Sequence, residues 1–97
     1  MNLRTLHYFV VIADAGSFTA AAAALSVAQP ALTRQVRDLE AELGVQLLQR
    51  GARGVRLTQG GATLYESARR MLAEAARVRL QLGGGGSART PRAAGRA

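Results

Sequence analysis

The sequence predicts a mainly helical fold, with three helices, a two-stranded β-hairpin and a long fourth helix. Two observations lead to this prediction. Apolar residues recur at helical spacing in three segments before residue 44, and again between about residues 59 and 82. Two short apolar segments, 47–50 and 55–58, lie between these regions and are joined by GARG, a pattern typical of a hairpin.

The first two helices are predicted over residues 3–15 and 18–25. Gly16 ends the first helix, and Ser17 is a suitable N-cap for the second. One face of the first helix is apolar and is expected to be buried: Leu3, Leu6, Val10 and Ala13, with Phe9 beside them. The second helix is short and rich in alanine, so its expected core contacts are few: Phe18, Ala22 and Leu25.

The third helix, expected over residues 29–43, has a proline in its first turn. Pro30 loses no hydrogen bond there, because the first N–H groups of a helix have no intrahelical acceptor. It therefore places the helix start near Ala28 or Gln29, and Gly44 is positioned to end the helix. One stripe is apolar and is expected to pack on the first two helices: Leu32, Val36, Leu39 and Leu43.

The fourth helix is expected to begin after Thr58, its N-cap, and to extend to about Leu82. From Gly83 onward the chain reads GGGGSARTPRAAGRA, which lacks the apolar residues needed for a core. The order helix, short helix, long helix and β-ribbon is that of a winged helix-turn-helix. We therefore predict a winged helix-turn-helix domain over 1–58, a linker or dimerisation helix over 59–82 and a disordered basic tail over 83–97.

The net charge of +7 arises from 13 basic residues, all of them arginine, and six acidic residues. Three arginines lie in 83–97, so residues 1–82 carry ten arginines and six acidic residues, a net charge of +4. A positive excess of this kind suggests a polyanionic partner. The chain has no cysteine, no apolar stretch of membrane-spanning length and no signal-peptide pattern, and these absences predict a cytoplasmic protein.

The sequence does not indicate an enzyme, and no cofactor or metal site is expected. Its one histidine, His7, is expected on the surface of the first helix. Three acidic residues of the third helix, Asp38, Glu40 and Glu42, do not form a matched pair on one face, so they are interpreted as solvated charges. No phosphate-binding glycine loop precedes a helix.

The polar side of the third helix is the candidate DNA-reading surface. In a helix-turn-helix, the first turns of the motif's second helix meet base edges in the major groove. Arginine pairs well with guanine, glutamine with adenine, and a threonine methyl packs on the methyl of thymine. The residues expected to contact DNA from this helix are Gln29, Pro30, Thr33, Arg34 and Arg37. The alternative is an ordinary solvated polar face.

The hairpin is expected to supply a second contact with DNA. Arg50 and Arg53 lie in or beside the GARG turn, where they would reach phosphates or a minor groove. Arg56 fits this role or that of an exposed strand residue equally well.

These segments together resemble the N-terminal DNA-binding domain of LysR-type transcriptional regulators over residues 1 to about 80. The resemblance rests on MNLRTLHYFVVIADAGSFTAAAAAL, AQPALTRQVRDLEAELGVQLLQR and RGVRLTQGG. It implies sequence-specific binding of double-stranded DNA, with the third helix as reader and the 47–58 hairpin as wing. The family usually has serine where this chain has Ala28, which implies somewhat weaker binding. It also carries a C-terminal effector-sensing domain, which we expect to be absent here together with any small-molecule effector site.

The fourth helix carries the pattern of a two-stranded seam. Apolar residues recur at alternating steps of four and three: Leu64, Ala68, Met71, Ala75, Val78 and Leu82. The resemblance favours a homodimer that sets two recognition helices about one DNA turn apart. The alternative is an amphipathic helix packed on its own domain.

Two rival functions remain open at this point. The chain could be a protein-interaction module whose long helix forms dimers with a full-length regulator, its own DNA contact being incidental. It could instead bind nucleic acid without sequence preference through the tail arginines, in which case truncation after Leu82 would abolish binding.

Overall fold

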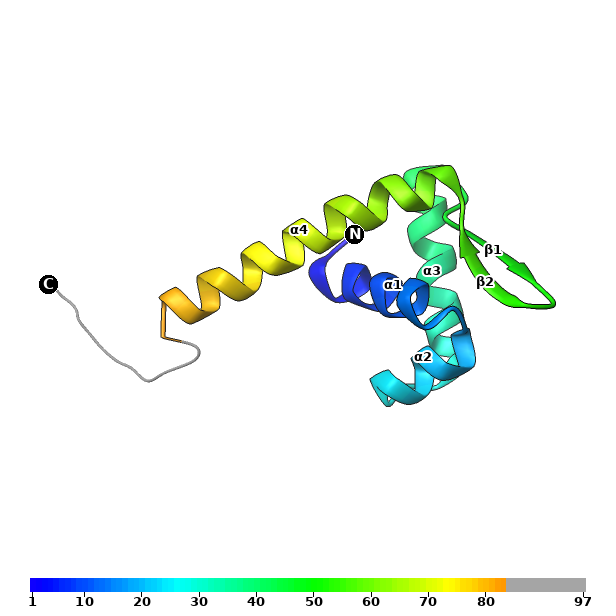
Figure 1. The fold of residues 1–97 in the computed structure, drawn as a ribbon, viewed down its shortest axis with the longest axis horizontal. Coiled ribbons are helices and arrows are strands. Elements are labelled where there is room, and N and C mark those ends of the chain that lie inside the picture. The colour runs from blue at the N-terminus through cyan, green and yellow to red at the C-terminus, as the bar shows by residue number, and fades with distance from the viewer. Residues whose placement is uncertain (84–97) are drawn as a thin grey trace, which may run out of the picture.

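The computed structural model describes residues 1–83 and contains, in chain order, α1 (Leu3–Ala15), α2 (Phe18–Leu25), α3 (Gln29–Leu43), β1 (Leu48–Gly51), β2 (Gly54–Leu57) and α4 (Gln59–Gln81) (Figure 1). The helices begin and end where the sequence predicts them, within about one residue, and the winged helix-turn-helix fold is confirmed. Apart from Gly83, the predicted basic tail lies outside the described residues.

Side-chain caps fix the starts of three helices. Asn2, Ser17 and Thr58 each accept a hydrogen bond from a backbone N–H in the first turn of α1, α2 and α4, respectively. The turn between α2 and α3 has only three residues, 26–28, because Ser26 takes the left-handed conformation with φ of 56°. Ser26 is the one non-glycine residue with positive φ in residues 1–83. The turn at Ser26 sets the direction in which the chain enters α3.

The core lies where the first three helices meet the base of the hairpin. On α1 the buried residues are Leu6, Phe9 and Ile12, whereas Leu3 is 40% exposed. The buried face is therefore rotated from the predicted one, because α1 packs against α2 and α3 on one side and against α4 on the other. On α3 the buried stripe is confirmed at Leu32, Val36 and Leu39 but not at Leu43, which is 39% exposed.

The hairpin has a shorter loop than the sequence suggests. β1 and β2 pair antiparallel from Leu48 opposite Leu57 to Gly51 opposite Gly54, which leaves Ala52 and Arg53 as the two loop residues. Of the two glycines, only Gly54 has a positive φ, 112°. A Cβ at Gly54 would also lie 2.4 Å from the carbonyl oxygen of Gly16, so the backbone of the wing needs glycine there to approach the α1–α2 turn.

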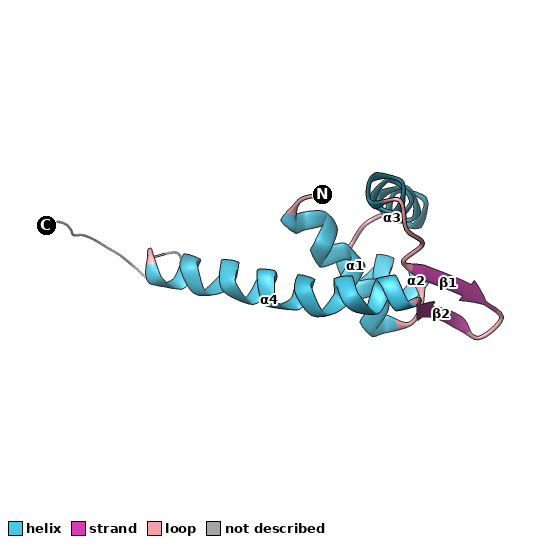
Figure 2. Cartoon of the chain, turned by 90° about the horizontal axis from the view of Figure 1, so that it is seen from above, coloured by secondary structure: helices cyan, strands magenta, loops and turns pink. Residues whose placement is uncertain are grey.

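α4 packs along α1 near its own start and then extends beyond the body of the molecule, in the direction opposite to the hairpin (Figure 2). Tyr65 of α4 donates a hydrogen bond to the carboxylate of Asp14 on α1, and Arg69 donates to the Tyr65 hydroxyl at 3.2 Å. Farther along, Arg77 pairs with Glu74 and holds the pKa of that carboxyl below its usual value. No helix within residues 1–83 is both long enough and apolar enough to span a membrane.

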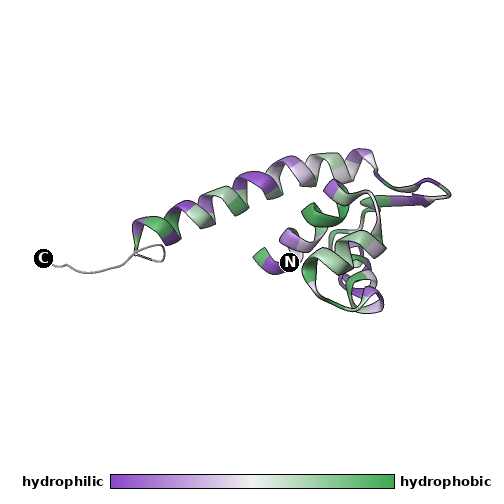
Figure 3. Cartoon of the chain, turned by 60° about the horizontal axis from the view of Figure 1, so that its bottom comes forward, coloured by the Kyte–Doolittle hydropathy of each residue, from purple (hydrophilic) through white to green (hydrophobic). Residues whose placement is uncertain are grey.

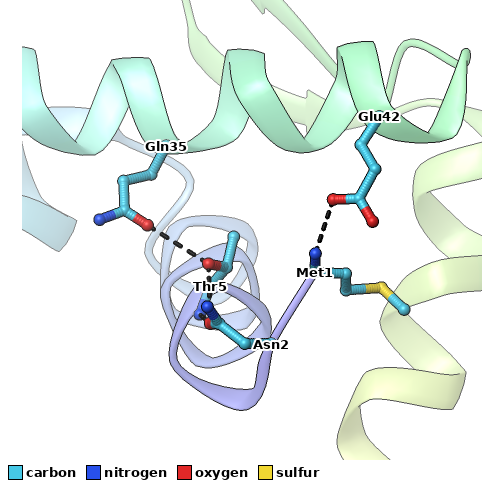
Figure 4. A network of polar contacts seen from close by, with 5 residues as sticks. All are labelled: Met1, Asn2, Thr5, Gln35 and Glu42. Atoms are coloured by element: carbon cyan, nitrogen blue, oxygen red, sulfur yellow. Dashed lines mark hydrogen bonds and ion pairs between the residues drawn. The ribbon is translucent and has the colours of Figure 1, made fainter.

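A small polar network joins the start of α1 to α3 (Figure 4). The Met1 amine pairs with Glu42 at 2.6 Å, and the Thr5 hydroxyl lies 3.3 Å from the Gln35 amide oxygen. Asn2 completes the network by accepting from the Thr5 hydroxyl at 2.9 Å. Glu42 is therefore paired with the N-terminal amine rather than purely solvated, and the network holds α3 against the start of α1.

Candidate DNA-binding surface

The start of α3 is fixed by its backbone and not by a capping side chain. Ala28 is the N-cap and makes no side-chain hydrogen bond, and Pro30 lies in the first turn. The Ala28 carbonyl accepts from the N–H groups of Ala31 and Leu32, both at 3.1 Å. α3 thus begins where Pro30 predicts. Gln29 and Pro30 are exposed at its N-terminal end, the end predicted to enter the major groove of DNA.

The side of α3 that faces away from the core carries the predicted reading residues. Arg34 and Arg37 are exposed, and Thr33 is half-buried at the edge of the stripe. Figure 3 shows hydrophilic and hydrophobic segments alternating along the helical ribbons, as expected for helices with one buried side. The structure therefore leaves this face free to meet a large ligand.

One hydrogen bond joins this face to the preceding helix. The Thr19 hydroxyl of α2 donates to the Gln29 amide oxygen at 3.1 Å. This pair is not predictable from the sequence pattern, because the two residues lie ten positions apart and meet only when the 26–28 turn folds the two helices together.

Arginines surround the tip of the hairpin. Arg50, Arg53 and Arg56 are exposed and line the same hollow beside the turn. Arg50 is also held internally, since its guanidinium lies 4.2 Å from the centre of the Phe18 ring at the start of α2. Arg37 and Arg50 line one cleft between α3 and β1, so the reading helix and the wing present their arginines on a common side.

None of the ion pairs formed within residues 1–83 uses an arginine of α3 or of the hairpin. The arginines of α4, in contrast, include Arg70 and Arg77, which pair with Glu66 and Glu74 of the same helix. The positive charge of the α3 and hairpin surface is therefore not neutralised by nearby carboxylates. Such a surface is suited to phosphate groups.

Glu40 positions the hairpin relative to α3, a role that the sequence analysis missed. One of its carboxylate oxygens accepts from the N–H groups of Leu47 and Leu48, at 2.8 and 3.3 Å. The interpretation of Glu40 as a solvated charge is therefore wrong. The hairpin has a second anchor on β2, where the Val55 N–H donates to the Gly16 carbonyl at 3.0 Å. The spacing in the sequence gave no sign of Glu40's role, because its partners are backbone N–H groups at the base of the hairpin.

The predicted seam of α4 divides into two parts. Ala68 is fully buried and Leu64 is half-buried against the chain's own core, so packing within the domain accounts for this end. Beyond it the apolar side chains are largely exposed: Met71 at 38%, Val78 at 37% and Leu82 at 82%, with Ala75 half-buried. Leu80, which the seam pattern omits, is 68% exposed. Only the outer half of α4 therefore offers an unpaired apolar face.

Residues 1–83 contain no group of three or more metal-ligating side chains, and His7 is exposed on α1. A helix-turn-helix with a flanking hairpin and unpaired arginines on both defines a DNA-binding protein of the winged helix-turn-helix class.

The particular family follows from comparison with known proteins. Residues 3–62 match the model of bacterial regulatory helix-turn-helix proteins of the lysR family. The chain therefore belongs to the lysR family, and its folded part is a LysR-type DNA-binding domain.

Relatives of known description agree with this assignment. The chain is 51% identical over 77 residues to the HTH-type transcriptional regulator TcbR of Pseudomonas sp. (strain P51), covering 79% of this chain and 26% of TcbR. It is also 51% identical over 80 residues to the nitrogen assimilation regulatory protein nac of Escherichia coli, covering 82% of this chain and 26% of the relative. The chain thus spans about a quarter of the length of the curated relatives that it matches.

Solved structures of the same domain include complexes with DNA. The CbnR DNA-binding domain bound to DNA is 48% identical with a TM-score of 0.79, over 84% of this chain and 93% of that one. The BenM DNA-binding domain with benA site 1 DNA is 44% identical with a TM-score of 0.81, over 84% and 95% of the two chains.

Proposed function

We propose that this chain binds double-stranded DNA with sequence specificity, as the DNA-binding part of a bacterial transcriptional regulator. The observation that carries the proposal is the set of unpaired arginines shared by α3 and the hairpin. In this arrangement the first turns of α3 enter the major groove, where Gln29, Thr33 and Arg34 meet base edges. Pro30 and Arg37 flank this contact, and Arg50 and Arg53 meet the backbone or the minor groove.

Two related structures support the proposal, since the CbnR and BenM domains were solved in complexes with DNA. Relatives described as transcriptional regulators favour binding over catalysis, so we assign no enzymatic role to the chain. Bacterial DNA lies in the cytoplasm, and we place the protein there, associated with the nucleoid when bound.

A selection of bound sequences from random duplex DNA, at a stated salt concentration, tests the proposal. We expect one preferred sequence, and we expect Arg34→Ala to lower affinity and relax preference at one base pair, at a cost of about 1–3 kcal/mol. Arg79→Ala, on the exposed outer part of α4, is the matched control and should leave the preference unchanged. Equal binding of all sequences by the wild-type chain would contradict the proposal.

The dependence of affinity on salt provides a second test. Four arginines of the proposed surface, Arg34, Arg37, Arg50 and Arg53, each neutralise about one phosphate, so log K against log salt should have a slope of about −4 per monomer. Removing one of them should reduce the slope by about one. A slope near zero would contradict the interface.

We further propose that two chains pair through the outer half of α4. Met71, Val78 and Leu82 supply the exposed apolar face of this contact. Light scattering over a concentration series should show a dimer, and Val78→Glu should shift it to a monomer. If the chain stays monomeric at high concentration, or pairs only with a full-length regulator, the homodimer is wrong and the protein-interaction alternative gains support.

A further inference from the structure

We propose that Thr19 is a positioning residue for base reading and that its hydroxyl orients the Gln29 amide at the start of α3. The inference rests on the proposed function. It starts from the 3.1 Å hydrogen bond that Thr19 Oγ1 donates to Gln29 Oε1. Both residues are exposed, on different helices, across the three-residue turn 26–28. Within residues 1–83, Thr19 is the only side chain that hydrogen-bonds the Gln29 amide.

The chemistry of the amide explains what this bond leaves free. A glutamine side chain has two lone pairs on its oxygen and two N–H donors. Thr19 uses one lone pair, so one acceptor position and both donors remain. An adenine in the major groove presents an acceptor at N7 and a donor at N6, which a glutamine meets with one donor and one acceptor. The bond to Thr19 is thus compatible with full recognition of adenine.

Thr19 itself stands on a rigid support. It follows Phe18, a core residue that is 6% exposed, and the Ser17 cap fixes the first turn of α2. At the start of α3, Ala28 has no polar side chain that could hold Gln29 from the other side. The hydroxyl of Thr19 therefore restricts a long side chain before DNA arrives, and this lowers the entropy lost when the amide meets a base.

Because Thr19 is exposed, an effect on base reading can be measured separately from an effect on folding. Because the side chain is exposed, Thr19→Val keeps its shape, removes the hydroxyl and should leave thermal stability close to that of the wild type. The expected effect is a loss of discrimination, by about three- to tenfold, at the single base pair that Gln29 reads. Binding of non-specific DNA should be unchanged.

The experiment is a double-mutant cycle on the sequence obtained by selection with the wild-type chain. Gln29→Ala first identifies the base pair that Gln29 reads, as the one whose preference is lost. DNA affinity is then measured for the selected sequence and for versions changed at this base pair, with four proteins: the wild type, Thr19→Val, Gln29→Ala and the double variant. Thr19→Val should weaken discrimination at this base pair alone, and it should have no further effect once Gln29 is alanine. Thr19→Ser, which keeps the hydroxyl, should restore most of the discrimination.

A second threonine–glutamine pair is the matched control. Thr5 on α1 and Gln35 on α3 also face each other, with the Thr5 hydroxyl 3.3 Å from the Gln35 amide oxygen (Figure 4). Thr5→Val should leave discrimination unchanged.

If the wild-type chain selects a preferred sequence, the proposed function stands, and either of two results would then overturn the role of Thr19. One is that Thr19→Val discriminates as well as the wild type. The other is that Thr19→Val weakens binding to every sequence equally, which would mean that Thr19 contacts the DNA backbone. A wild-type chain without any sequence preference would overturn the proposed function as well, so the two failures are distinguishable.

Discussion

The guanidinium of Arg50 lies 4.2 Å from the centre of the Phe18 ring, so the wing and the first residue of α2 are joined by a cation–π contact. Phe18 belongs to the core cluster and is 6% exposed. An arginine of the hairpin thus rests directly on a residue of the hydrophobic core. The contact aims one positive charge toward the cleft that Arg37 also lines.

The planar guanidinium of Arg50 is expected to matter as well as its charge. Arg50→Lys keeps the charge but loses the planar group that rests on the ring, so the charge is held less firmly before binding and DNA affinity should fall by about two- to fivefold. Titration of a labelled duplex at low salt measures this. Arg56→Lys, on β2 with no aromatic partner in the described structure, is the control and should have a smaller effect. Equal losses in both variants would contradict a special role for Phe18.

A capping side chain at Ala28 should stabilise the domain. Ala28 is the N-cap of α3 and provides no side-chain acceptor, although the N–H of Ala31 lies within reach of this position. Ala28→Ser is expected to raise the free energy of unfolding by about 1 kcal/mol, measured by urea denaturation. Ala31→Ser, inside the first turn, introduces the same hydroxyl without a cap and should not stabilise. A destabilised Ala28→Ser variant would show that the turn cannot accommodate the side chain.

The start of α4 should distinguish sharply between two adjacent glycines. A Cβ on Gly61 would lie 2.0 Å from the carbonyl oxygen of Leu47, whereas a Cβ on Gly60 would meet the Val45 side chain, which is 44% exposed and can rotate away. Gly61→Ala is therefore expected to destabilise the fold by about 1–3 kcal/mol.

Gly60→Ala is the control for this prediction and should cost much less, since alanine also favours helix. Thermal unfolding followed by circular dichroism measures both variants. Equal melting temperatures for the two variants would contradict the close approach of Gly61 on α4 to the Leu47 carbonyl.

Removal of the Glu40 carboxylate should loosen the wing. Glu40→Ala leaves the N–H groups of Leu47 and Leu48 without their acceptor, and both of these residues are buried. The expected loss of stability is about 1–3 kcal/mol. Hydrogen exchange should show faster exchange of these two amides, and DNA affinity should fall because the wing arginines are no longer held.

Asp38→Ala is the matched control for Glu40→Ala, because Asp38 is exposed on the same helix and makes no hydrogen bond to the hairpin. It should change neither amide exchange nor the stability of the wing. Unchanged exchange in Glu40→Ala would show that the hairpin is positioned by its other contacts alone.

Much of the fold could be predicted from local signals. Pro30, Gly44 and the Ser17 cap place helix ends because each acts through its own backbone or its nearest neighbours. The exposed side of α3 was predictable from periodicity for the same reason. The buried side of α1 was not, since it depends on two helices that contact α1 from different directions.

The candidate site shows the same division. The residues that lie on the outer side of α3 and in the hairpin turn were predictable from the chain alone, because helical period and turn chemistry are properties of short segments. Three contacts depend instead on tertiary packing: Arg50 stacks on Phe18, Glu40 holds the wing and Thr19 binds Gln29. These contacts join residues 7 to 32 positions apart, and their geometry is set by how the helices pack, which no local pattern encodes.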